Sequence, residues 1–198
     1  MLKIHKSNLE LNLSALKHSC YLCNTQIQQE CRGFEQPVGG TSIPTGLSKH
    51  YNLFTSTLPV FFELYKEISK AFQEIEHDTT LSYWIVGWLN VWPNKGEVLP
   101  WHGHGGSGGN EHNQFHGYFG VDCDANSVTE YRFRDTTDII ASVHNKNNQL
   151  VITNSVGVEH RTSNWDEDFP RITIAFQIQS TETIMDDVGH KLNYYIPV

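Results

Sequence analysis

The pattern of apolar residues after Thr80 restricts the fold of this chain more than any other feature. From Leu81 to Trp92 the residues are mostly apolar at both odd and even positions, which is typical of a strand covered on both faces. Further runs of strand character, separated by Gly, Asn and Asp residues, cover residues 115–121, 129–133, 149–153 and 171–178. No segment of helical period separates these runs. The pattern therefore predicts an all-β sandwich or jelly-roll, and not a fold of alternating strands and helices.

The first 80 residues have a different pattern. Apolar residues recur every three or four positions between residues 58 and 75, which predicts an amphipathic helix that Thr57 could cap. A shorter helix is predicted between residues 9 and 29. The chain has 198 residues, of which 38% are hydrophobic, and this is enough for one core. We expect a single domain of residues 1–198, with a mostly helical cap at 1–80 and a jelly-roll core at 81–180.

Composition argues against several classes of function. Fourteen basic and 22 acidic residues give a net charge of −8, and Lys and Arg form no cluster, so no nucleic-acid partner is expected. No apolar run approaches the ~20 residues of a membrane-spanning helix, and residues 1–10 lack the apolar segment of a secretory signal. We expect a soluble, cytoplasmic protein without a membrane partner. Cys20, Cys23, Cys31 and His18 could bind zinc, but buried, reduced thiols on a helix are the simpler explanation.

Three of the eleven histidines have the spacing of metal ligands. In an extended chain His102 and His104 lie on the same face, so both imidazoles can point at one centre. His160 follows the strand predicted at residues 149–153. Three imidazoles brought together by a barrel could occupy one face of an octahedral metal and leave the other positions open to small ligands.

Arg171 predicts an anion site in the same barrel. It begins the last predicted strand and shares one face of that strand with Thr173 and Ala175, whereas large apolar residues alternate on the other face. A guanidinium inside an otherwise apolar barrel requires an anionic partner, because an unpaired buried charge is costly.

Together these motifs resemble those of the 2-oxoglutarate- and Fe(II)-dependent oxygenases. The matching elements are His102-x-His104 as an H-x-(D/E/H) element, the strand Phe115-His-Gly-Tyr-Phe-Gly-Val121, Gly157-x-x-His160 and Arg171-x-Thr173. The resemblance spans residues 84–178 and is greatest to small bacterial and phage-type members, less to the aspartyl/asparaginyl β-hydroxylases. It implies a double-stranded β-helix (a cupin-like jelly-roll) and an enzyme that uses Fe(II), 2-oxoglutarate and O₂. The implied reaction is the oxidation, by hydroxylation, of a small molecule or a protein side chain.

The resemblance also implies roles for individual residues. His102 and His160 would be the first and last iron ligands. Arg171 would form a salt bridge to the distal carboxylate of 2-oxoglutarate, and Thr173 would add a hydrogen bond. His116 matches a histidine that binds the 2-oxoglutarate carboxylate in the β-hydroxylase branch.

Three further positions are weaker candidates for the cosubstrate pocket. Tyr118 shares a strand face with His116 and could line the pocket. Asn90 and Tyr131 are polar residues on predicted core strands and could orient the 1-carboxylate. Polar groups in such places are more often structural residues with satisfied hydrogen bonds.

His104 departs from the family, which generally has a carboxylate at this position. Three arrangements are open: a metal held by three imidazoles, which we favour; His102 and His160 with a water molecule, as in the β-hydroxylase branch; or a shifted register that starts at His104 and places Gly106 at the carboxylate position, as in halide-binding members. Glu111, in a glycine-rich loop at 103–114 that could act as a lid, is a further candidate ligand.

Two other functions compete with the oxygenase. One is a cupin-type metal-binding protein that does not use 2-oxoglutarate. The other is a non-catalytic jelly-roll interaction module, which the absence of a carboxylate at position 104 makes a serious alternative.

Overall fold

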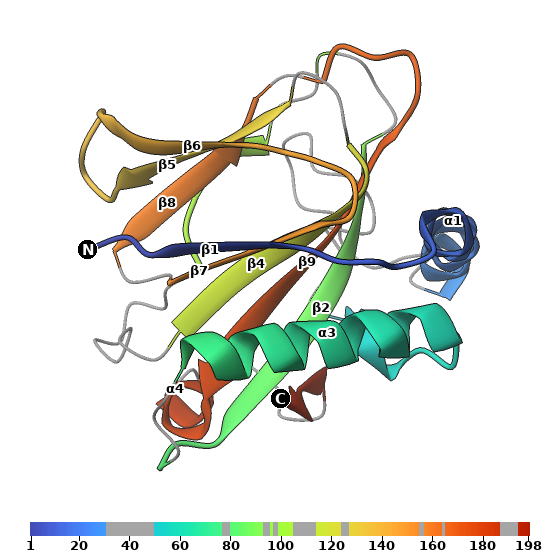
Figure 1. The fold of residues 1–198 in the computed structure, drawn as a ribbon, viewed down its shortest axis with the longest axis horizontal. Coiled ribbons are helices and arrows are strands. Elements are labelled where there is room, and N and C mark those ends of the chain that lie inside the picture. Colours follow the sequence, from blue (N-terminus) through green and yellow to red (C-terminus); the bar gives the residue numbers. More distant parts are fainter. Residues whose placement is uncertain are drawn as a thin grey trace.

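Two antiparallel sheets face each other in the computed structural model, which describes residues 1–30, 50–76, 80–92, 96, 99–104, 114–123, 127–154, 157–163, 165–186 and 194–198 (Figure 1). The major sheet consists, in spatial order, of β1 (Ile4–Asn8), β7 (Gln149–Asn154), β4 (Gln114–Asp122), β9 (Arg171–Ser180), β2 (Tyr83–Trp92) and β10 (Ile196–Pro197). The minor sheet consists of β3 (Leu99–His102), β8 (Val158–Thr162), β5 (Val128–Phe133) and β6 (Ile139–His144). This is the predicted mainly-β jelly-roll, or double-stranded β-helix.

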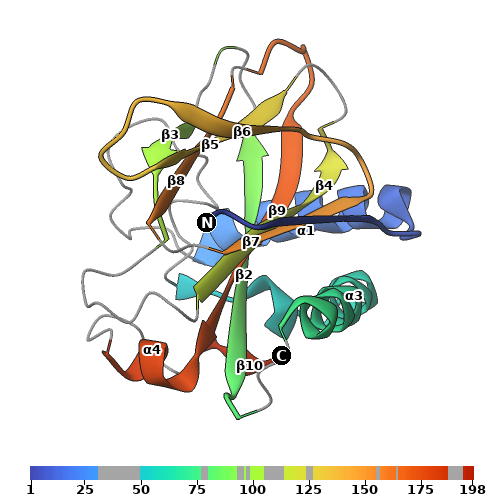
Figure 2. The ribbon, with the colours of Figure 1, turned by 60° about the vertical axis from the view of Figure 1, so that its left-hand side comes forward.

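Helices lie against both faces of the major sheet: the first three cover its outer face, and Ile184 of the last packs against Val86 on the opposite face. They are α1 (Leu13–Glu30), the short 3₁₀ helix η2 (Leu53–Thr55), α3 (Pro59–Ile75) and α4 (Thr181–Asp186), which follows β9 directly. In Figures 1 and 2, α3 lies against the major sheet on the side away from β5, β6 and β8. No described helix combines the length and the apolar composition that crossing a membrane requires.

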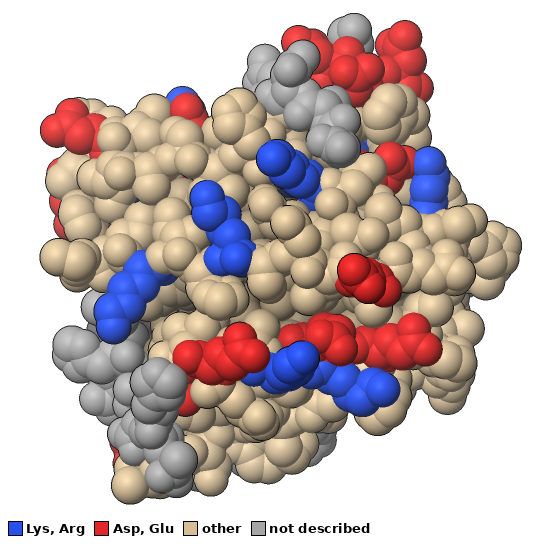
Figure 3. All heavy atoms as spheres, viewed as in Figure 1, with Lys and Arg blue, Asp and Glu red and all other residues tan. Residues whose placement is uncertain are grey.

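The amphipathic pattern of α3 explains how it packs. Phe61, Leu64 and Ile68 are fully buried in the core that α3 shares with α1 and the major sheet. On the exposed side of α3, acidic and basic side chains lie next to one another (Figure 3). The predicted cap at Thr57 is wrong: the helix begins after Leu58, which makes no side-chain cap hydrogen bond, and Pro59 occupies the first turn. Proline is favoured there because its missing N–H would have no helical partner.

The side chains of β9 alternate between the two faces of the major sheet. Ile172, Ile174 and Phe176 pack into the core with the helices. Ala175 instead packs against Tyr118 and the residues between the two sheets. The alternation predicted for this strand is therefore present, and its polar positions face the space between the sheets.

The N-terminal region is not only helical. β1 pairs with β7, from Ile4 opposite Thr153 to Asn8 opposite Gln149, and so extends the major sheet. The residues of β1 are partly exposed and mixed in polarity, so they form no apolar run that predicts a strand.

The cysteines of α1 belong to the core. Cys20 and Cys23 are buried, and burial raises the pKa of both thiols, so they pack as protonated, apolar groups. His18 lies on the exposed side of the same helix. The alternative zinc site therefore does not have its ligands on one face of α1, and Cys31 lies outside the described residues.

Candidate metal and anion site

Four histidines converge between the two sheets. The ligand nitrogens of His102, His104 and His160 all lie within 4.8 Å of one another. The ring centroids are 4.2 Å apart for His102 and His160, and 5.1 Å apart for His104 and His160. His116 adds a fourth ring, stacked on His160 with an interplanar angle of 11° and a centroid distance of 4.5 Å. The sequence motif H-x-H and the distant His160 thus form one cluster.

Strand register explains why these side chains meet. His102 at the end of β3 lies opposite His160 in β8, and His160 lies opposite Tyr131 in β5. Residues that face each other across antiparallel strands project their side chains to the same side of the sheet. His104 follows β3, and its main-chain carbonyl oxygen accepts a hydrogen bond from Gln177 Nε2 at 2.9 Å. This bond ties the segment after β3 to the major sheet.

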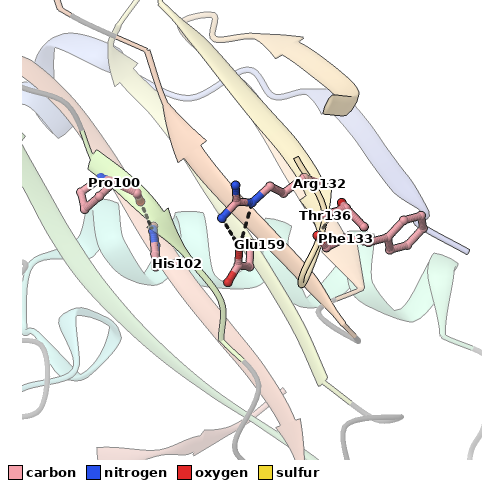
Figure 4. Close-up of polar contacts among 6 residues, drawn as sticks. All are labelled: Pro100, His102, Arg132, Phe133, Thr136 and Glu159. Carbon is pink, nitrogen blue, oxygen red and sulfur yellow. Dashed lines mark hydrogen bonds and ion pairs between the residues drawn. The ribbon is translucent and has the colours of Figure 1, made fainter. Parts of the chain in front are cut away.

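The hydrogen bonds of the rings determine which nitrogens are available. His102 Nδ1 lies 2.9 Å from the carbonyl oxygen of Pro100, which only accepts hydrogen bonds (Figure 4). Nδ1 must therefore carry the proton, and Nε2 is left with a lone pair for a metal. His160 Nδ1 is buried and has no hydrogen-bond partner within the described part of the chain. Such an orphaned buried atom is costly unless it is satisfied by a ligand or water.

Burial keeps the three converging imidazoles neutral. It lowers the pKa of His102 and holds the pKa values of His104 and His160 well below the ordinary range, and the neighbouring imidazoles lower the pKa values of His104 and His160 further. Neutral imidazoles are the form that binds metal. Three such donors suit a first-row transition metal such as iron, and the residues therefore fit the ion that the sequence implies.

His116 lies beside the metal ligands. Its ring is buried, and its Nε2 shares a hydrogen bond with Thr153 Oγ1 at 2.8 Å. Burial, with a contribution from His102, lowers the pKa of His116 to about 3. A neutral ring at this place can donate or accept one hydrogen bond toward a ligand.

Arg171 provides the second part of the site. It is 5% exposed, its Nε has no hydrogen-bond partner among the described residues, and no carboxylate of those residues pairs with it. Burial lowers the pKa of its guanidinium, while Cys123 and Tyr118 act in the opposite direction. A buried cation of this kind requires an anion. Beside it Thr173 is buried and accepts a hydrogen bond from Asn90 Nδ2 at 3.3 Å.

Tyr118 connects the anion site with the histidines. His116 and Tyr118 are successive inward residues of β4, about 7 Å apart along the strand. Tyr118 lies near Arg171, and burial raises its pKa. On the opposite sheet the ring of Tyr131 lies 6.0 Å from His160 and 6.2 Å from His116.

The nine candidate residues all face the space between the two sheets, with the histidines gathered in one cluster and Arg171 near Tyr118. They are His102, His104, His160, Arg171, Thr173, His116, Tyr118, Asn90 and Tyr131. Glu111, Gly106 and most of the predicted lid lie outside the described residues. Two further residues contact the site without having been predicted from the sequence: Gln177, and Trp88, whose ring centroid is 5.7 Å from that of His104. Gln177 lies on the same face of β9 as Arg171 and Thr173. The alternation of side chains along this strand could therefore have indicated that Gln177 faces the site.

Solved structures with the same fold cover most of this chain. A Pseudomonas putida prolyl-4-hydroxylase matches with a TM-score of 0.58 and 8% identity over 89% of this chain and 91% of its own. A prolyl hydroxylase from Trichoplax adhaerens, in complex with a peptide fragment of the hypoxia inducible factor oxygen degradation domain, matches with a TM-score of 0.58 and 8% identity. The match covers 91% of this chain and 84% of the hydroxylase. HygX from Streptomyces hygroscopicus, with nickel and 2-oxoglutarate bound, matches with a TM-score of 0.54 and 11% identity. The match covers 90% of this chain and 83% of HygX.

The fold is that of the 2-oxoglutarate- and Fe(II)-dependent oxygenases. Neither a family model nor a curated protein matches the sequence. At 8 to 11% identity the likeness establishes the oxygenase fold alone. The chemistry depends on the site, which contains three converging imidazoles and a buried arginine.

Proposed function

We propose that the protein is a 2-oxoglutarate- and O₂-dependent non-haem Fe(II) oxygenase that hydroxylates a small molecule or a protein side chain. Arg171 is the observation that carries this proposal. Its guanidinium is buried without a carboxylate partner among the described residues, in the same inter-sheet region as the three neutral histidines. Burying an unpaired guanidinium costs free energy, and an anionic ligand such as an oxo-acid would offset that cost. A metal-binding protein that uses no oxo-acid would have no such ligand.

The proposed metal ligands are His102, His104 and His160. Fe(II) held there would couple oxidative decarboxylation of 2-oxoglutarate to oxidation of a substrate C–H bond. Because all three ligands are neutral, the site adds no negative charge to the metal. An anionic cosubstrate would supply that charge, which agrees with a site that recognises a dicarboxylate.

The remaining candidates have proposed roles in binding and orientation. Arg171 and Thr173 bind the distal carboxylate, since a planar guanidinium matches a carboxylate with two parallel hydrogen bonds. His116, Tyr118, Asn90 and Tyr131 line the path from that carboxylate to the metal and orient the keto-acid end. Their burial excludes water from the reacting groups.

Absorption spectroscopy without O₂ tests the proposal directly. Wild-type protein with Fe(II) is expected to develop the visible band of the Fe(II)–2-oxoglutarate chelate, and to form succinate once O₂ is admitted. Arg171→Ala is expected to weaken 2-oxoglutarate binding by about 100-fold or more, because it removes a charged hydrogen-bonding partner. Arg171→Lys should be intermediate, because the charge remains without the planar fork.

Metal affinity measured on the same variants is the control. Arg171→Ala should bind Co(II) as tightly as wild type, and Lys70→Ala, on the exposed side of α3, should change neither affinity. Wild-type protein that binds metal but gives no band and no succinate would contradict the oxygenase and favour a cupin-type or non-catalytic protein.

The third ligand is tested at His104. If its ring binds the metal, His104→Ala weakens metal binding by at least about tenfold, and His104→Asp, with the carboxylate typical of the family, restores much of it. Unchanged affinity in His104→Ala would instead support a metal held by His102, His160 and water.

A further inference from the structure

The strand that carries His102 has few contacts of its own. β3 is four residues long, lies at the edge of the minor sheet and pairs only with β8 among the described strands. Its pairing shifts register between Leu99 and His102, so the ladder is irregular in that interval. A short, irregular edge strand is poorly fixed by its main-chain hydrogen bonds. The bond from Gln177 to the His104 carbonyl fixes the chain after β3, and a further contact within β3 would help to hold His102 opposite His160.

Trp101 provides a contact on the outer face of the minor sheet. Successive residues of a strand point to opposite faces, so Trp101 faces outward where His102 faces the site. The guanidinium carbons of Arg132 and Arg161 lie 4.3 and 4.8 Å from the centroid of the indole ring. Arg132 belongs to β5 and Arg161 to β8, so one ring on β3 contacts side chains of two other strands. Both distances are within the range of cation–π contacts.

Two carboxylates orient these guanidinium groups. Arg132 donates from Nε to Glu159 Oε2 at 2.9 Å, and its Nη2 lies 2.7 Å from the same oxygen (Figure 4). Arg161 Nε donates to Glu130 Oε2 at 2.7 Å. Each pair lies directly across β5 and β8 in register. Partly exposed ion pairs contribute little to stability, but they restrict the plane of each guanidinium, which lets it lie over the indole.

We propose that Trp101 is a positioning residue for the metal ligand His102, held by Arg132 and Arg161 on the outer face of the sheet. The proposal rests on the proposed metal site, because it assigns a task to the strand that presents its first ligand. The contact acts through the main chain of β3. A fixed β3 keeps the His102 ring against both the Pro100 carbonyl and the ring of His160.

The tautomer of His102 in the metal-free protein is the first readout. Nitrogen NMR of the imidazoles is expected to show the Nδ1–H form in wild type, because Nδ1 donates to Pro100. Trp101→Leu should give a mixture of tautomers, since the bond from Nδ1 to the Pro100 carbonyl depends on the local conformation of β3, which the indole contact helps to fix. Trp101→Phe retains an aromatic face and should largely keep the wild-type form. A role in stability alone would lower the melting temperature without changing the tautomer of the folded protein.

Metal affinity is the second readout. Trp101→Leu is expected to weaken Co(II) binding about 10- to 100-fold, the range seen when supporting groups of metal ligands are removed. Should Trp101→Leu fail to fold, the double variant Arg132→Gln/Arg161→Gln removes both cations and keeps the indole. The matched control is Lys66→Met, which removes the described cation–π contact of Lys66 with Phe62 on α3, at 5.4 Å. It should leave both readouts unchanged.

The outcomes separate this proposal from the proposed function. A folded Trp101→Leu variant with the wild-type His102 tautomer overturns the positioning role, whether or not the protein binds metal. Wild-type protein that binds no Co(II) would contradict the metal site, and the tautomer measurement would still decide the role of Trp101.

Discussion

The four imidazoles of the site are held by different contacts, and these contacts distinguish their roles. His102 is oriented by the Pro100 carbonyl, and His116 by the Thr153 hydroxyl. His104 is held through its main chain by Gln177. His160 alone has a buried Nδ1 without a hydrogen bond among the described residues, although its ring contacts the other three. A bound ligand that reached this nitrogen would remove the cost of leaving it unsatisfied.

The buried state of His116 predicts a pH dependence of stability. Its pKa in the folded protein is about 3, against 6.5 for an unburied histidine. Between these values the unfolded chain binds a proton that the folded chain does not, so the free energy of unfolding falls as the pH falls below 6.5. His116 alone contributes a slope of up to about 1.4 kcal/mol per pH unit within that window. Urea unfolding of metal-free protein from pH 7 to pH 4 measures this slope, which should be smaller in His116→Gln.

A histidine outside the cluster provides the control for this slope. His144 is exposed on β6, and His144→Gln is expected to keep the wild-type dependence. If His116→Gln showed the same slope as wild type, the ring of His116 would have to be protonated in the folded protein, against its buried position.

The positions of the candidate residues were predictable to the extent that they depend on the alternation of side chains along strands. The convergence of His102 and His160 and the inward position of Arg171 follow from alternation along β3, β8 and β9. The contact of His104 with Gln177 was not predictable, because it depends on the path of the chain after β3 has ended. Nor did the sequence show that the ring of His116 stacks on His160, since that depends on the distance between the two sheets.

At the scale of elements, Gly117 determines how closely β4 approaches its neighbours. It lies between His116 and Tyr118 and points to the opposite face. A Cβ at this position would lie 2.3 Å from the Val151 carbonyl oxygen and 2.4 Å from Cζ of Phe176. Neither neighbour can move freely, because one is strand backbone and the other is a fully buried ring.

Gly117→Ala is therefore expected to destabilise the protein. Overpacking of a tight core costs about 1–3 kcal/mol or more, so the free energy of unfolding should fall by at least that range. Denaturant unfolding measures the effect, with Ser142→Ala on the exposed side of β6 as a control that should stay within about 0.5 kcal/mol of wild type. A Gly117→Ala variant as stable as wild type would show that β4 can move away from β7.

The strands that the sequence predicted are the most buried ones. β2, β4, β5, β7 and β9 form apolar or alternating runs and were found within two residues of their ends. β1, β3, β6 and β8 were missed because exposed or charged residues interrupt their patterns, as in Val-Glu-His-Arg-Thr of β8. β10 has only two residues, too few for any periodicity. The end strands of both sheets thus lack the burial that produces a recognisable sequence pattern.

In the whole molecule, the two faces of the major sheet serve different purposes, one in stability and the other in the candidate site. One face packs with α1 and α3 into the large core, and the other carries His116, Tyr118, Arg171 and Thr173. Because neighbouring residues of one strand point to opposite faces, both tasks depend on the same backbone but on different side chains. Stability and ligand binding should therefore be separable by substitution.

Leu64→Ala tests this separation. Leu64 is fully buried in α3, on the side of the sheet away from the histidines, and loss of its side chain is expected to lower the free energy of unfolding by about 2–5 kcal/mol. Under conditions where the variant remains folded, its affinity for Co(II) should match that of wild type, since no ligand is displaced.

His160→Ala should show the reverse, with a large loss of affinity and a smaller loss of stability, because it removes a buried polar atom that has no protein partner among the described residues. Calorimetric metal titration together with denaturant unfolding gives both quantities for each variant. Parallel losses of affinity and stability in Leu64→Ala would mean that the helices hold the site in shape through β4 and β9, and that the two faces act as one unit.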